Sequence, residues 1–153
     1  MTVEEAYKKV DEVADNLGMP IDEGIKKTVV GLWANGIETT GSCQGHRKHG
    51  EPFPWIDVEM PDPDEWEHNS AIKAAWKKAN SKQRLVLQKL LDEFNKAAEF
   101  PYPLTLIPRG IYGAVRLQTG RTKSIVDMIP PNFLDELQRQ MNAFADFLLN
   151  NNP

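Results

Sequence analysis

The residues best suited to chemistry lie in one short segment, residues 41–59, which reads GSCQGHRKHGEPFPWIDVE. This segment holds the chain's only cysteine, Cys43, and two of its three histidines, His46 and His49. Gly41, Gly45 and Gly50 stand among them. Reactive side chains gathered on a loop between strands are typical of sites carried by a rigid scaffold. We therefore expect the working site here.

Metal binding is one chemistry that fits. Cys43, His46 and His49 have the spacing C-x2-H-x2-H, and thiolate with imidazole suits zinc. A catalytic zinc needs only three protein ligands and a water, although this is not the spacing of a zinc finger. Four further side chains offer ligand atoms: Glu51, Asp57, Glu59 and His68.

Nucleophilic catalysis is the second chemistry. Cys43 would attack, His46 or His49 would act as its base, and Asp57 would orient the imidazole. Members of such a triad usually meet in space rather than along the chain. The catalytic set is then Cys43, His46 and Asp57.

Anion binding is the third chemistry and our leading hypothesis. Glycines let successive backbone amides point at an anionic group. The residues 109–123 contain four basic side chains and no acidic one, and alternation on the predicted strand 111–118 puts Arg116 and Gln118 on one face with Tyr112. If polar strand faces meet, Asp57 and Glu59 share that cleft. The predicted ligand-binding residues are Gly41, Ser42, Gln44, Gly45, His46, His49, Trp55, Arg116 and Arg121.

These chemistries leave three functions open. The first is a small-molecule-binding domain for a nucleotide-like or other anionic ligand, with residues 41–50 as its cradle. The second is a small enzyme, either a zinc-dependent hydrolase or a methyltransferase. The third is an interaction protein such as a phage inhibitor, with which the acidic loop 61–65 is compatible. A purely structural interpretation also stands, because Cys43 has the strand parity of Ile37 and fits a small buried residue.

The motif at residues 37–46, followed by His49-Gly50 and Pro54-Trp55, resembles short uncharacterised proteins of bacteria and their phages with the pattern G-S-C-x-G-H…H-G…P-W. It is more distantly similar to the tRNA wyosine-derivative methyltransferase family, whose T-S-S-C-S-G-R segment matches at Thr40, Ser42, Cys43 and Gly45. Here Gly41 replaces a serine and His46 replaces the arginine. That resemblance implies S-adenosylmethionine as cofactor and RNA as partner. Zinc and S-adenosylmethionine both stay open as cofactors.

The elements that must position this segment follow from hydrophobic periodicity. Helical spacing covers residues 3–17, after a capping box formed by Thr2 and Glu5, and residues 20–34; these two helices form a hairpin. It also covers residues 131–148 and residues 65–100. The last of these ranges is either one helix or two pieces, with Asn80 capping the second piece. Alternation predicts strands at 37–43, 55–60, 104–107 and 111–118. Strands in pairs, without single helices between them, favour an α+β fold: a small, mostly antiparallel sheet of about four strands covered by helices.

Composition limits the number of domains, the kind of partner and the cellular compartment. A chain of 153 residues fits one domain, residues 1–153, and a net charge of −4 argues against a general nucleic-acid coat while leaving room for a local basic patch. A single cysteine suits a reducing compartment, and no apolar run suggests a membrane span. We expect a cytoplasmic protein with no membrane partner.

Overall fold

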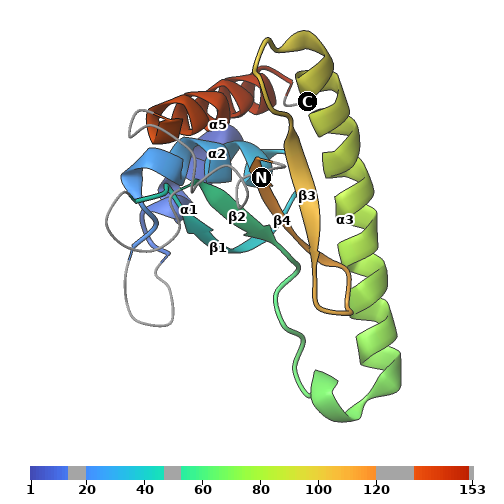
Figure 1. Ribbon diagram of the computed structural model, residues 1–153. Helices are drawn as coiled ribbons and strands as arrows, with labels where there is room; N and C mark the ends of the chain where they lie inside the picture. Colours follow the sequence, from blue (N-terminus) through green and yellow to red (C-terminus); the bar gives the residue numbers. More distant parts are fainter. Residues whose placement is uncertain (14–19, 47–52, 120–132, 152–153) are drawn as a thin grey trace.

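The computed structural model describes residues 1–13, 20–46, 53–119 and 133–151, and these form a mixed α+β fold as predicted (Figure 1). The sheet has four antiparallel strands in the order β1-β2-β4-β3. In chain order the elements are α1 (Val3–Val10), α2 (Glu23–Ala34), β1 (Thr39–Cys43), β2 (Trp55–Val58), the 3-10 turn η1 (Trp66–His68), α3 (Ser70–Ala97), β3 (Leu104–Arg109), β4 (Ala114–Thr119) and α5 (Phe133–Asn150).

The helices cover one face of the sheet. Ile56, Val58, Val115 and Leu117 alternate with polar residues along β2 and β4, and all four belong to one buried core with side chains of α2, α3 and α5. Figure 1 shows α5 beside α2, while α3 runs along β3 and β4. The strand residues between the core positions therefore form a second, polar face, on which the site residues Trp55, Asp57 and Arg116 lie.

A bulge in β1 changes which face its residues use. Thr39 pairs with Val58, but Gly41 pairs with Asp57 and Cys43 with Trp55, so the register slips between Thr39 and Gly41. Residues directly opposite one another in an antiparallel pair share a face. Cys43 is therefore on the side of Trp55 and is only partly buried, and counting parity from Ile37 places it wrongly.

The N-terminal hairpin is confirmed in outline. α1 begins with the predicted capping box between Thr2 and Glu5, and it packs on α2. It ends at Val10, short of the expected residue 17; residues 14–19 lie outside the described part of the chain. None of the helices in the described ranges is both long and apolar enough to cross a membrane.

The third helix is one long element, the first of the two predicted alternatives. α3 is continuous from Ser70 to Ala97, with no break at Asn80, and its first turn is capped by Asn69, whose side chain accepts from the amides of Ala71 and Ile72. Asn80 does not cap a helix. Its side chain accepts from the Met60 amide at 2.6 Å and donates to the Tyr112 carbonyl at 2.9 Å. Asn80 therefore joins α3 to the strand ends.

Candidate metal site

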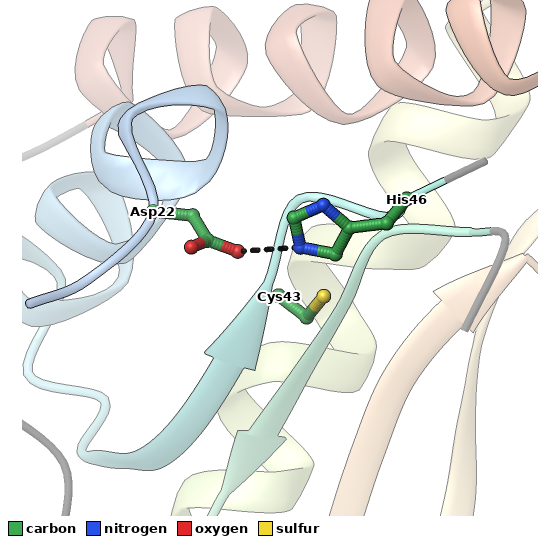
Figure 2. Close-up of side chains that lie close together, drawn as sticks. All are labelled: Asp22, Cys43 and His46. Carbon is green, nitrogen blue, oxygen red and sulfur yellow. Dashed lines mark ion pairs between the residues drawn. The ribbon is translucent and has the colours of Figure 1, made fainter. Parts of the chain in front are cut away.

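Three potential ligand side chains converge where β1 ends beside the start of α2. Asp22, Cys43 and His46 each offer one ligand atom, and these atoms all lie within 4.8 Å of one another (Figure 2). The Asp22 Oδ2 atom is 3.4 Å from His46 Nε2. Two such ligands on a tetrahedral zinc lie about 3.3–3.4 Å apart, given metal–ligand bonds of about 2.0–2.1 Å. This pair already has the spacing that zinc requires.

Asp22 is available because it does not cap its own helix. It occupies the N-cap position of α2, yet its side chain accepts no hydrogen bond from that helix. Instead, Gln44 supplies the cap from another part of the chain: its Oε1 accepts from the Gly24 amide at 2.8 Å. In return, the Gln44 amide donates to Asp22 Oδ2 at 3.1 Å. This reciprocal pair holds the start of α2 against the end of β1.

Two glycines make this close approach feasible. A Cβ atom on Gly24 would lie 2.5 Å from Gln44 Oε1, so a side chain there would displace the cap. Gly45 has a φ of +87°, in the region that favours glycine, and a Cβ there would lie 2.7 Å from Leu134 Cδ1. From α5, Gln138 Nε2 also donates to the Gln44 carbonyl at 2.9 Å. Elements α2, β1 and α5 thus fix the backbone that carries Cys43 and His46.

The orientation of His46 favours a metal over a cysteine nucleophile. Figure 2 shows that Nε2, the nitrogen facing Asp22, is on the ring edge nearer Cys43, whereas Nδ1 lies on the far edge. A Cys–His–Asp relay needs the cysteine and the carboxylate on different ring nitrogens. Three ligand atoms within 4.8 Å of one another are instead what a metal ion requires. The Gly45 amide also donates to Cys43 Sγ at 3.4 Å, an outer contact of the kind that orients metal ligands.

The same hydrogen bonds use backbone amides that we expected to bind an anion in the cradle at residues 41–50. The amides of Gln44 and Gly45 already donate to Asp22 and Cys43, so neither points at an external anion. Residues 47–52 lie outside the described part of the chain, and His49 with them. In the described part of the loop, these two amides are therefore already used within the protein and do not form an anion cradle.

A second group of charged residues occupies the polar face of the sheet. Asp57 accepts from Arg116 Nε at 2.7 Å and from Arg116 Nη2 at 3.1 Å, and it also pairs with Arg109. The Arg116 guanidinium stacks on Trp55, 3.9 Å from the ring centroid. The cationic group predicted to meet a ligand is thus already paired within the protein. Arg121, the other predicted charge partner, lies outside the described residues.

Glu59 lies beside this group. Burial raises the pKa of the Glu59 carboxyl above its ordinary value, repulsion from Asp62 and Asp57 adds to the rise, and Arg109 opposes it. Gln118, which we expected in the same cleft, is buried. The predicted meeting of polar strand faces therefore holds for Asp57 and Arg116, as a structural ion pair.

The remaining predicted residues divide between the two regions. Gln44 and Gly45 border the metal group, whereas Ser42 pairs with Ile56 and so faces the core. Among the described residues, the converging group includes neither Asp57, Glu59 nor His68. The carboxylate beside His46 is Asp22, which our sequence reasoning missed. Its signal was an aspartate directly before a helix, a position usually explained by capping alone.

Comparison with family models, with curated proteins and with solved structures gives no match.

Proposed function

We propose that this protein binds a zinc ion through Asp22, Cys43 and His46, and that the ion in turn binds an anionic small molecule. The single observation that carries the proposal is the convergence of three unlike ligand atoms within 4.8 Å. Sulfur, imidazole nitrogen and carboxylate oxygen together suit zinc better than magnesium or calcium, which prefer oxygen alone. The proposed ligand is therefore still an anionic small molecule, but the metal ion, rather than backbone amides, would bind it.

The number of ligands supports an open site. Structural zinc sites are closed by four protein ligands, whereas sites that bind substrate keep three and leave the fourth position to water. The described residues supply three. A carboxylate or phosphate oxygen entering the fourth position replaces that water and pairs with the charge of the ion. His49, if it approaches, would close the position and make the site structural.

Hydrogen bonds to the proposed ligands also support metal binding. The amide of Gly45 stabilises the Cys43 sulfur, and the amide of Gln44 holds Asp22 Oδ2 in place. Outer contacts of this kind orient metal ligands, and their loss typically costs about 10- to 100-fold in metal affinity. A thiolate sulfur and an oxygen or nitrogen ligand on a tetrahedral zinc lie about 3.6 Å apart, so separations of up to 4.8 Å would shorten by about 1.2 Å at most on binding.

The test is metal binding by the purified chain. We expect about one zinc per chain by plasma mass spectrometry, in line with a three-ligand site, and a thiolate-to-metal absorption band after exchange for cobalt. Cys43→Ser and His46→Gln should each lose the metal, while His68→Gln, a matched change in η1, should keep it. A chain that takes up no zinc or cobalt, or that binds equally well in Cys43→Ser, would overturn the assignment.

The anionic ligand is tested separately on the cobalt form. Acetate and inorganic phosphate should each perturb the cobalt spectrum if a coordination position is open. A spectrum that neither anion changes, in a protein that holds the metal firmly, would mean a closed structural site. His49→Gln then shows whether that histidine is the fourth ligand.

A further inference from the structure

Helix α3 concentrates positive charge on a protein that is acidic as a whole. The residues 70–91 contain six basic side chains and no acidic one, although the chain carries a net charge of −4. Within the described ranges, none of the six forms an ion pair with a carboxylate. The six are Lys73, Lys77, Lys78, Lys82, Arg84 and Lys89.

These cations form two rows along the helix. At 3.6 residues per turn, Lys73, Lys77 and Arg84 fall on one line, and Lys78, Lys82 and Lys89 fall on another about 120–140° around the axis. Between the rows lies a ridge of exposed, uncharged residues, Ala74, Ser81 and Leu85. The core-facing stripe of α3, which includes Trp76 and Leu87, lies on the other side of the helix. The basic face thus has a neutral centre with a positive margin on each side.

From this arrangement we infer that α3 binds double-stranded DNA, with the neutral ridge in the major groove and one row of cations toward each phosphate backbone. A major groove about 12 Å wide admits one α-helix, whereas the major groove of duplex RNA is too narrow. The small side chains of Ala74 and Ser81 allow close approach. Leu85, 73% exposed, has the apolar surface that meets a thymine methyl group.

The shape of the molecule leaves this helix accessible. In Figure 1 the N-terminal turns of α3 extend beyond the β3–β4 hairpin, and the basic residues from Lys77 onward are exposed. The acidic residues Asp62, Asp64 and Glu67 precede α3 and would repel phosphate. They limit the contact to the stretch that begins near Lys73, which extends about 24 Å to Lys89 at 1.5 Å per residue.

The experiment is fluorescence anisotropy with a labelled mixed-sequence duplex of about 20 base pairs, two turns of B-DNA. Six phosphate contacts predict that log K falls against log salt with a slope of about −5 between about 50 and 200 mM. Lys78→Gln with Lys82→Gln should weaken binding about tenfold or more at the lower salt and reduce the slope by about two. Lys8→Gln with Lys9→Gln, an equal loss of positive charge on α1, should change binding little.

Three results would overturn the inference. The first is no salt-dependent binding of the duplex. The second is an equal loss in both double variants, which would mean that net charge alone is responsible. The third is stronger binding of duplex RNA, or of an acidic peptide with as many charges, because neither requires a groove of this width. Circular dichroism and zinc content of each variant establish that the fold and the metal site are intact.

Discussion

At the scale of single residues, Asp22 has two separable duties. Its Oδ2 accepts from the Gln44 amide, which links α2 to β1, and it also faces His46, beside which we propose that it binds zinc. Asp22→Asn keeps an oxygen acceptor for the amide but loses the charge that zinc requires. We expect zinc affinity to fall about 10- to 100-fold or more, by analogy with losses around other metal sites.

The stability of the same variant separates the two duties. The free energy of unfolding of the metal-free Asp22→Asn chain should fall by only about 1 kcal/mol, since a neutral hydrogen bond replaces one accepted by a carboxylate. Asp22→Ala should lose both metal and stability. Zinc titration and urea unfolding, run side by side, measure the two effects. Unchanged zinc affinity in Asp22→Asn would remove Asp22 from the ligand set.

Glu59 gives a pH-dependent prediction. The pKa of its carboxyl is raised in the folded state, first by burial and then by repulsion from Asp62 and Asp57. The folded state therefore binds this proton more tightly than the unfolded state, and the stability it contributes is lost as the pH rises through the raised pKa. Glu59→Gln removes this loss, so the variant should exceed the wild type in stability at about pH 7 and match it at about pH 3.5.

Urea midpoints at the two pH values provide the measurement for Glu59. Glu93→Gln is the matched control, because Glu93 is exposed on α3. It should show no such dependence. A Glu59→Gln variant less stable than the wild type at neutral pH would mean that attraction to Arg109 outweighs burial and repulsion.

At the scale of elements, Asn80 fixes α3 against the strands. Both ends of its buried amide are used, on the Met60 amide and the Tyr112 carbonyl. Asn80→Ala leaves two backbone groups without these partners, and a buried group that loses its partner costs about 1–3 kcal/mol. We expect the free energy of unfolding, measured by urea denaturation, to fall by about 2–4 kcal/mol. The exposed neighbour Ser81→Ala should cost far less, and equal losses would contradict this role.

Asn80 also shows where sequence reasoning reaches its limit. Periodicity predicted the four strands and the helices around them, because the spacing of apolar residues within each segment shows which of its faces is buried. It did not distinguish an asparagine that caps a helix from one that bonds to distant strands. A break at Asn80, one of the two predicted alternatives, would also divide the run 70–91, whose acid-free composition becomes a charged face only when the helix is continuous.

The candidate site was also only partly predictable from the sequence. Cys43 and His46 stand out by residue type, and the structure brings them together. The bulge in β1 was not predictable, since it depends on how the strand pairs with β2. The role of Asp22 was not predictable either, because its partners are more than 20 positions away along the chain. The two hydrogen bonds that join Gln44 to the start of α2 are tertiary contacts.

At the scale of the whole molecule, metal binding should stabilise the fold, because the ligands come from separate elements. Asp22 directly precedes α2, Cys43 ends β1, and Gln138 of α5 donates to the Gln44 carbonyl between Cys43 and His46. An ion bound by these ligands in the folded state alone adds about 2.7 kcal/mol when its free concentration is 100 times its dissociation constant. For a chain of this size that corresponds to a rise in Tm of about 5–11 °C.

Differential scanning calorimetry with and without zinc measures this rise. Wild type and His68→Gln should show it equally, whereas Cys43→Ser should show none. The size of the shift should also fall with decreasing pH, since protons compete with the metal for thiolate and imidazole. A protein that binds zinc with no change in Tm would hold the ion equally well when unfolded. The ligands would then not be joined through the fold, and the geometry of Asp22, Cys43 and His46 would not be what binds the metal.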